Sequence, residues 1–249
     1  MNRSGRINHE PAFMLSALPW RESSLRVEMY SRTYGRVSLL ARSARKRQSE
    51  LRGVLVPFVP VSVSWYGEGE LKTLHRAEWL GGWPQPAGLG LFSAMYANEL
   101  VGSLTGREDP NPQLYDALAD VLQAVCTRNN HIAALRVFEW KLLQCSGLAP
   151  DISCDADGRE IEEQAHYLMR PEAAPCRLPS VQTFETPFAC IKGATLLDLA
   201  AGSFGSGENL HQALQLNRMM LDFRLPEIKT RRILQQLQAW SREERSTAQ

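Results

Sequence analysis

Residues 25–41, LRVEMYSRTYGRVSLLA, decide how the N-terminal part of the chain folds. Apolar and polar side chains alternate over residues 25–31, which is typical of a strand with one solvent-exposed face. Residues 33–35, Thr-Tyr-Gly, are a turn candidate, and the extended pattern resumes over residues 37–41. The stretch therefore predicts two neighbouring strands joined by a tight turn.

Three further strands are predicted around this hairpin. Residues 12–18 are an apolar run that ends at Pro19, and residues 71–79 follow a glycine-containing turn at residues 66–69. Residues 54–65 also alternate, and their two prolines suit an edge strand or a bulge. Five short strands in about 70 residues, with a long connection between the third and the fourth, predict a small antiparallel barrel.

The periodicity changes after GGWPQP at residues 81–86, where we place a domain boundary. Residues 1–82 then form the barrel domain, and residues 83–249 form a mostly helical domain with an irregular, turn-rich insert at about residues 147–187. Apolar residues at three- and four-residue spacing predict the helices: 89–105, 112–126, 131–146, 193–199, 206–221 and 228–244. The predicted fold class is α+β, a five-stranded barrel followed by helices.

The almost neutral total charge hides an asymmetry between the two parts. The 249 residues include 28 Lys and Arg and 27 Asp and Glu. Residues 1–83 hold 13 basic and 7 acidic residues, a net charge of +6, whereas residues 84–249 hold 15 and 20, a net charge of −5. Such a split points to separate domains and is compatible with separate partners, but it names neither partner. No apolar signal core or membrane-length apolar run is present in the sequence, so we expect a cytoplasmic protein.

The densest basic cluster lies between the third and fourth predicted strands, in ARSARKRQSELRG at residues 41–53. It holds one acid, Glu50, and five cations: Arg42, Arg45, Lys46, Arg47 and Arg52. Arginine makes forked contacts with phosphate, and several in one loop give salt-dependent, sequence-independent nucleic-acid binding. Nearby aromatic residues would stack on bases if they lie on the barrel surface: Trp20, Tyr30, Tyr34, Trp65 and Tyr66. The alternative is a solvated turn above a barrel whose aromatic residues are core.

Two other basic features are open to more than one interpretation. A C-terminal basic group either extends a nucleic-acid surface or balances the carboxylates of its own domain: Arg218, Arg224, Lys229, Arg231 and Arg232. Arg136 lies in an otherwise apolar helix, where it would either accept an acidic, hydrophobic peptide or pair locally with Glu139 or Trp140.

The sequence lacks the spacings that metal or covalent chemistry requires. The five cysteines are widely spaced, and neither Cys154 nor Cys176 has the close second ligand of a four-ligand zinc site. Ser153 and Gln164 stand where a calcium loop requires Asp and Glu. No G-x-S-x-G or lysine-containing phosphate loop is present. The insert's acidic cluster lacks the supporting ligands of a nuclease: Glu160, Glu162 and Glu163. We therefore expect no metal, no cofactor and no enzymatic activity.

Several segments occur in an order that points to a known family. They are PWRESSL at residues 19–25, TYGRV at 33–37, LRG at 51–53, PF at 57–58, GELKTL at 69–74, LRVFEWKLL at 135–143, Gly147 and KTRR at 229–232. In this order and at this chain length, the set resembles the RecO family of bacterial recombination mediators. The resemblance covers nearly the whole chain.

That resemblance implies an OB-fold joined to a helical domain and non-covalent work on DNA at the nucleoid. It implies binding of single- and double-stranded DNA, strand annealing, and contact with the acidic C-terminal tail of single-stranded-DNA-binding protein (SSB). It also implies partnership with RecR in loading RecA. We predict contact of the SSB tail at Arg136 and a DNA-binding face on the barrel: Arg36, Arg42, Arg45, Lys46, Arg47, Arg52 and Lys72. The alternative is a generic OB-fold nucleic-acid-binding module without mediator activity.

Overall fold

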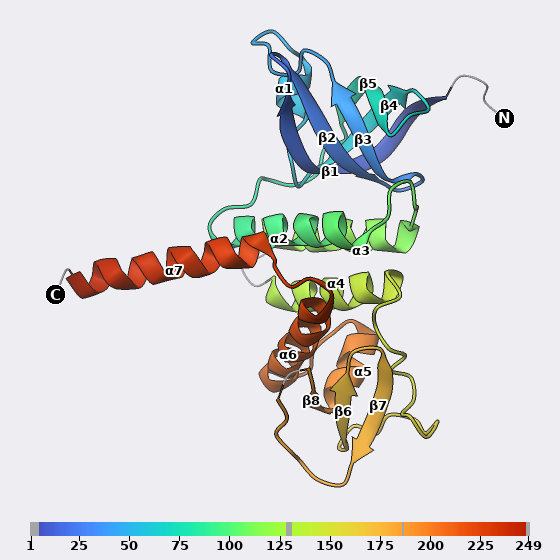
Figure 1. The fold of residues 1–249 in the computed structure, drawn as a ribbon, viewed down its shortest axis with the longest axis vertical. Helices are drawn as coiled ribbons and strands as arrows, with labels where there is room; N and C mark the ends of the chain where they lie inside the picture. The colour runs from blue at the N-terminus through green and yellow to red at the C-terminus, as the bar shows by residue number, and fades with distance from the viewer. Residues whose placement is uncertain (1–4, 128–130, 186, 248–249) are drawn as a thin grey trace. The chain divides into compact units, whose positions relative to one another are not determined.

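The computed structural model describes residues 5–127, 131–185 and 187–247, and only the backbone of residues 240–247 (Figure 1). The chain forms two compact units, Met1–Asn129 and Asn130–Gln249. The sequence boundary that we placed at residues 82 and 83 stays a prediction.

Within residues 5–127, the first unit is built on a closed barrel with the strand order β1-β2-β3-β5-β4. The strands are β1 (Arg6–Trp20), β2 (Ser24–Ser31), β3 (Gly35–Ala41), β4 (Pro60–Tyr66) and β5 (Leu71–Trp79). β1 pairs with both β2 and β4, so the barrel closes without a free edge. The predicted five-stranded, OB-type barrel is confirmed. The expectation of a wholly antiparallel barrel was wrong for one pair, since β3 and β5 are parallel.

The hairpin at residues 25–41 provides much of the barrel core. Val27 lies opposite Leu39 and Met29 opposite Val37, and all four side chains are buried. Each such burial stabilises the fold by roughly 1.5–3 kcal/mol relative to an exposed side chain. The core is completed from the other strands by Ala12, Met14, Val61, Val63, Trp65 and Leu74. The two-residue spacing of apolar side chains in the sequence therefore matches the spacing of these buried side chains along the strands.

Gly35 is required by the backbone of this hairpin. Its φ is +64°, and a Cβ there would lie 2.3 Å from the backbone oxygen of Asp109. Only glycine adopts this conformation without a steric cost and leaves room for so close an approach. The turn is thereby fixed against the backbone at Asp109.

The first unit also contains the short helix α1 and two long helices that cover one end of the barrel (Figure 1). Their bounds are α1 (Leu51–Val54), α2 (Leu89–Leu104) and α3 (Pro112–Thr127). Asn98 of α2 donates a hydrogen bond to the Met14 carbonyl of β1 (3.0 Å). Phe13 of β1 packs on Tyr115 of α3, with ring centroids 5.1 Å apart. Polar and aromatic contacts thus hold the helices to β1.

The described part of the second unit combines helices with a small sheet of order β7-β6-β8. The helices are α4 (Ile132–Cys145), α5 (Gly193–Ala201), α6 (Gly207–Arg224) and α7 (Lys229–Thr247), and the strands are β6 (His166–Arg170), β7 (Ala173–Leu178) and β8 (Ala189–Lys192). The prediction that residues 147–187 are irregular was wrong for β6 and β7. Tyr167 and Met169 of β6 are fully buried, but an alternation this short gives only a weak signal in the sequence. The predicted helical domain is otherwise confirmed.

Candidate nucleic-acid interface

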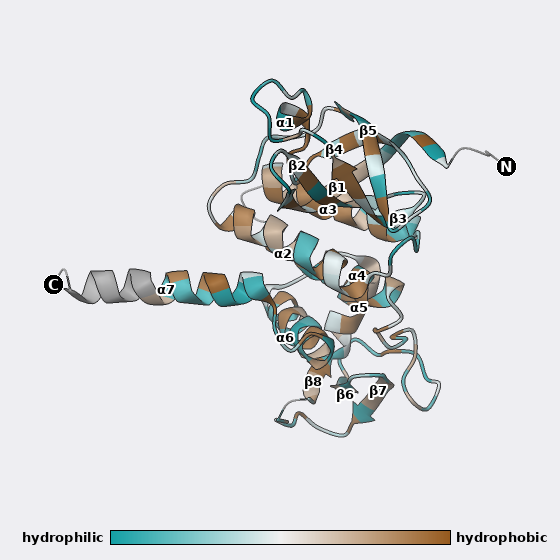
Figure 2. Ribbon diagram, turned by 45° about the horizontal axis from the view of Figure 1, so that its top comes forward, coloured by the Kyte–Doolittle hydropathy of each residue, from teal (hydrophilic) through white to brown (hydrophobic). Residues whose placement is uncertain are grey.

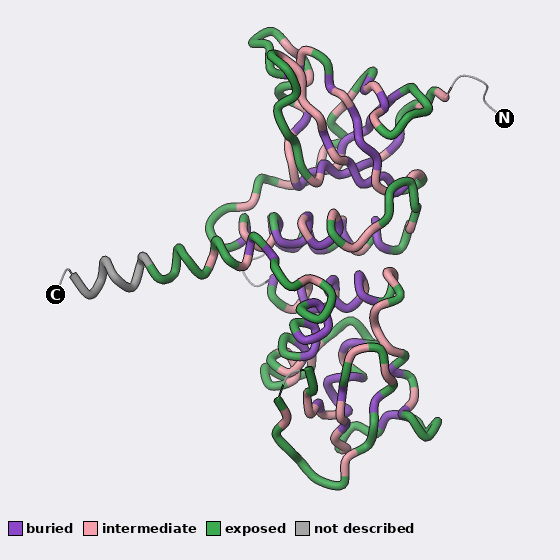
Figure 3. The backbone as a smooth tube through the Cα atoms, viewed as in Figure 1, coloured by how far each residue is buried: buried purple, intermediate pink, exposed green. Residues whose placement is uncertain are grey.

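The basic loop, residues 42–52, leaves β3 and runs into α1. Apolar residues within the loop and directly after it anchor the loop to the barrel. Ala44 and Leu55 are buried in the barrel core, while Leu51 and Val54 pack against that core. The residues between these anchors are left on the outer surface. Figure 2 shows this loop as hydrophilic, and Figure 3 shows it as largely exposed.

All five cations of this loop are exposed, and we call them the loop cations: Arg42, Arg45, Lys46, Arg47 and Arg52. None of them forms an ion pair with a carboxylate in the part of the chain that the structure describes. Ser43, Ser49 and Gln48 join two loop cations around a shallow hollow of about 420 Å³. Unneutralised charge concentrated on one loop attracts polyanions and raises their local concentration.

Arg45 ties the basic loop to the turn between β1 and β2. Its backbone N–H donates to the Ser23 carbonyl (2.8 Å). Its Nη1 donates weakly to the carbonyls of Arg21 (3.4 Å) and Glu22 (3.3 Å). The loop is therefore held at both ends and against a neighbouring turn, so its cations are presented by a fixed backbone.

Arg21 is an exposed cation beside the loop that was not predicted to bind DNA. It lies in the β1–β2 turn, whose carbonyl oxygens accept from Arg45. The signal was available: antiparallel pairing sets Leu25 opposite Ala41, which brings the start of β2 beside the start of the basic loop. The pairing register of β2 and β3, rather than the density of basic residues along the sequence, would have added Arg21 to the site.

Arg36 and Lys72, two other predicted DNA contacts, are engaged inside the first unit. Arg36 Nη2 donates to the Thr105 carbonyl (2.9 Å), and its Nη1 lies 4.0 Å from Glu28 Oε2. Lys72 is only 8% exposed, forms an ion pair with Glu108 and donates to the Gly69 carbonyl (3.1 Å). Phosphate would have to displace these partners, so both side chains are poorer candidates than the loop cations.

The aromatic residues divide between core and surface. Tyr30 and Trp65 are buried, and Tyr34 packs edge-on against Trp65 at 5.3 Å. Trp20 and Tyr66 keep partly exposed rings. Three of the five aromatic residues therefore belong to the barrel core, as the alternative interpretation expected, and two remain on the surface.

The arginines of the C-terminal basic group lie beside carboxylates. Arg218 Nε is 3.4 Å from Asp222 Oδ2. The other pairs are Arg224 with Glu172, Arg231 with Asp222, and Arg232 with Glu227. This geometry favours the interpretation that the group balances the charges of its own unit.

Arg136 is buried in α4 and forms the local pair that was the alternative to a peptide contact. Its Nη2 lies 3.0 Å from Glu139 Oε1, one helical turn away. Asn217 of α6 donates to Glu139 Oε2 (3.0 Å) and to the Arg136 carbonyl (2.8 Å). Arg136 is 6% exposed and Glu139 is 0% exposed, so the pair links α4 to α6 in the interior of the second unit.

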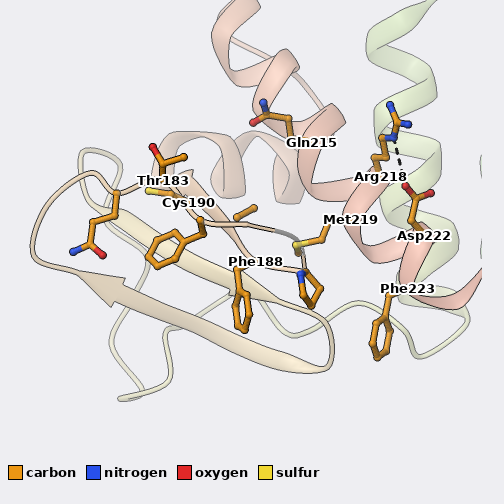
Figure 4. Close-up of a pocket in the computed structure, with 12 residues that line it drawn as sticks. Thr183, Phe188, Cys190, Gln215, Arg218, Met219, Asp222 and Phe223 are labelled. Atoms are coloured by element: carbon orange, nitrogen blue, oxygen red, sulfur yellow. Dashed lines mark hydrogen bonds and ion pairs between the residues drawn. The ribbon is translucent and has the colours of Figure 1, made fainter.

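A hollow of about 720 Å³ opens elsewhere in the second unit, between α6 and the segment that leads into β8 (Figure 4). Phe188, Met219 and Phe223 supply apolar surface, and the Arg218–Asp222 pair lies at its edge. The apolar side chains of this hollow suit a hydrophobic peptide, whereas Asp222 offsets the charge of Arg218 at its edge.

The described residues offer little support for a metal site, for catalysis by the acidic cluster of the insert or for a cysteine nucleophile. No group of three or more His, Cys, Asp or Glu in that part of the chain could hold a metal ion. Glu162, from the acidic cluster of the insert, forms a forked pair with Arg177, whose pKa is raised by this hydrogen bond and charge. Burial raises the pKa of the Cys126 thiol to about 11, so that thiol is a poor nucleophile at neutral pH. No helix in the described part of the chain is both long enough and apolar enough to cross a bilayer.

Comparison with known proteins identifies the family. The family described as Recombination protein O N terminal matches residues 6–83, and the one described as Recombination protein O C terminal matches residues 87–232. DNA repair protein RecO of Neisseria gonorrhoeae (strain ATCC 700825 / FA 1090) is 58% identical over 241 residues, which cover 95% of this chain and 97% of that protein. DNA repair protein RecO of Aromatoleum aromaticum is 40% identical over 241 residues, covering 96% and 99%. These relatives are named for DNA repair rather than for a catalysed reaction. The chain, with its closed barrel, helical second unit and exposed loop cations, therefore belongs to the RecO family of DNA repair proteins.

Proposed function

We propose that this protein is a non-enzymatic recombination mediator that binds DNA through the basic loop. In this role it anneals complementary strands and helps to load a RecA-like recombinase onto SSB-coated single strands. The observation that carries the proposal is the set of five exposed loop cations without carboxylate partners in the described residues of a RecO-family chain. A DNA repair protein works on the chromosome, so we expect it at the nucleoid.

Electrostatics supplies a route to annealing. Two complementary single strands repel each other through their phosphates, and a protein that neutralises both lowers that repulsion. Arginine and lysine do this without reading the sequence, because phosphate contacts position the nucleic acid whereas base contacts specify it. No bond is made or broken by the protein in this mechanism.

The expected salt dependence follows from the number of loop cations. If each neutralises one phosphate, the logarithm of affinity falls with the logarithm of salt concentration with a slope of about −4 to −5 for duplex DNA and about −3.5 for a single strand. Neutralising Arg45, Lys46 and Arg47 to glutamine should reduce the slope to about −2 and slow annealing correspondingly. A wild-type affinity that does not depend on salt would refute this mechanism.

A second triple variant provides the matched control. Arg224, Arg231 and Arg232 are already paired with carboxylates, so their replacement by glutamine removes the same charge from the second unit. We expect the annealing rate and the salt slope to stay near the wild-type values. An equal loss in both triple variants would instead establish the C-terminal basic group as a second DNA surface.

The partners follow from family membership as proposals. We expect contact with the acidic tail of SSB and with a RecR-like protein. Arg136 stays the predicted tail contact, although a tail carboxylate would have to compete there with Glu139. Arg218, at the edge of the hollow in Figure 4, is the second position to test. A generic nucleic-acid-binding module would bind DNA but not an SSB-tail peptide. Annealing of SSB-coated strands therefore separates a recombination mediator from a generic module.

A further inference from the structure

An apolar groove lies beside the basic loop on the first unit. It has a volume of about 770 Å³ and is lined by α1, β5 and the segment after β5. We call it the Trp79 groove, after its most exposed large side chain: it is lined by Gly53, Val54, Val56, Val59, Trp79, Gly82, Trp83, Pro84 and Gln85. Gly53 directly follows the loop cation Arg52, so the groove begins where the charged surface ends.

Trp79 is available for a ligand in a way that other groove residues are not. Its side chain is 63% exposed at the end of β5. Trp83, in contrast, donates its Nε1 proton to the Phe58 carbonyl (2.8 Å), and Gln85 donates to the Pro57 carbonyl (3.1 Å). These bonds hold the walls of the groove in place before any ligand arrives, which lowers the ordering cost of binding.

The chemistry of the groove and of its neighbours points to one class of occupant. An indole face stacks on any nucleobase, and a stacked base needs its phosphates held by cations close by. A base in duplex DNA is already stacked and paired, so it cannot enter without paying for unstacking. Unpaired bases carry no such cost.

We propose that the Trp79 groove is a base-binding subsite for single-stranded DNA, in which one nucleobase stacks on Trp79 while the loop cations hold the flanking phosphates. This inference rests on the proposed function, since it assumes that the basic loop binds DNA. It adds a strand preference: the loop cations bind both strand types, whereas the groove favours an unpaired strand.

The test compares Trp79→Ala with Leu80→Ala in the full-length protein. Leu80 is the next residue, is also exposed at 54%, and does not line the groove. Affinities for an oligothymidylate and for a duplex of the same length are measured by fluorescence anisotropy at one salt concentration. Denaturation curves verify that each variant is folded, and Trp79→Phe tests whether another aromatic ring restores stacking.

Trp79→Ala should weaken single-strand binding about tenfold, which is within the range for the loss of one stacked base, and leave duplex binding unchanged. Leu80→Ala should change neither affinity, and Trp79→Phe should recover most of the loss. Unchanged single-strand affinity in Trp79→Ala, or an equal loss for both strand types, overturns the subsite while leaving DNA binding by the loop intact. Loss of binding to a RecR-like protein with both DNA affinities preserved would overturn it by showing a protein-docking groove. If the wild type binds neither DNA, the proposed function itself fails.

Discussion

Replacing Arg136 by alanine should destabilise the second unit by about 3–5 kcal/mol, the usual cost of removing one partner from a buried ion pair. The Glu139 side chain is 0% exposed, and its Oε1 lies 3.0 Å from Arg136 Nη2. The variant therefore removes the Arg136 charge from beside a carboxylate in the interior. Asn217 still donates to Glu139 Oε2 (3.0 Å), but an amide does not neutralise a charge.

A double variant separates the charge effect from the loss of packing. Arg136→Met combined with Glu139→Leu removes both charges and keeps similar volume, which is often neutral or stabilising for a buried pair. Asn217 retains the Arg136 backbone carbonyl as its acceptor (2.8 Å). We expect the double variant to unfold at nearly the wild-type urea concentration. The measurement is urea denaturation followed by circular dichroism.

Two results would refute this reasoning. One is a cost below about 1 kcal/mol for Arg136→Ala, which is the value typical of an exposed pair. The other is a double variant that loses as much stability as the sum of its two single changes, since independent sites add and coupled sites do not. Either would mean that the pair is not buried and coupled as its geometry indicates.

The same variants decide how a loss of SSB-tail binding is interpreted. In Arg136→Ala, weakened peptide binding has two causes, the missing cation and a destabilised α4–α6 contact. The double variant lacks the cation but should be fully folded. Tail binding that is lost in both variants supports a direct contact, whereas binding that returns in the double variant assigns Arg136 a structural role.

Three further outcomes are expected. Lys46→Gln should reduce the salt slope of duplex-DNA binding by about 0.9 without affecting stability. Lys72→Gln should keep that slope and lower the free energy of unfolding by about 1.5–3 kcal/mol, as for hydrogen bonds to charged groups. Salt titrations measure the slopes, and urea denaturation measures the stabilities. Gly35→Ala should lower stability by at least about 1–2 kcal/mol because its φ is +64°, as urea denaturation would show. Burial, aided by the charges of Glu10 and Asp116, raises the pKa of Tyr115 from 10 to about 12. The protonated form is therefore favoured in the folded state, and this contribution to stability is complete below pH 10 and is lost between pH 10 and 12. Tyr115→Phe should lack that part of the decline in denaturation midpoints measured from pH 9 to 12.

The barrel and the long helices could be predicted because their apolar periodicity repeats over many residues. The basic loop could be found from its charge density alone, since residues 41–53 hold five cations and one acid. β6 and β7 were missed because five or six residues give too few repeats of the pattern.

The partners of two predicted DNA contacts could not be foreseen, because they depend on contacts between residues that are distant in the sequence. The partners of Lys72 and Arg36, Glu108 and the Thr105 carbonyl, lie 36 and 69 positions away along the chain. No local pattern reveals that the segment after α2 returns to the barrel and neutralises part of its charge. Charge density therefore led to the predicted DNA-binding face, but it could not separate cations that have partners within the first unit from cations that have no carboxylate partner in the described residues.

This separation has a thermodynamic consequence for the proposed interface. A cation that already has a buried partner must lose it before binding phosphate, so the gain is reduced by the cost of breaking the first pair. An exposed cation without a partner releases counterions from DNA at no such cost, and its contribution is removed by salt. Stacking on Trp79 involves no net charge and should change little with salt. If all five loop cations contact phosphate, the slope should be about −4.5 for duplex DNA and about −3.5 for a single strand, so raising the salt concentration should weaken both and shift the preference toward the single strand. Trp79→Ala should keep both slopes and lower the single-strand affinity by the same factor at every salt concentration, because the loop cations determine how steeply binding depends on salt and the Trp79 groove adds a contribution that salt does not remove.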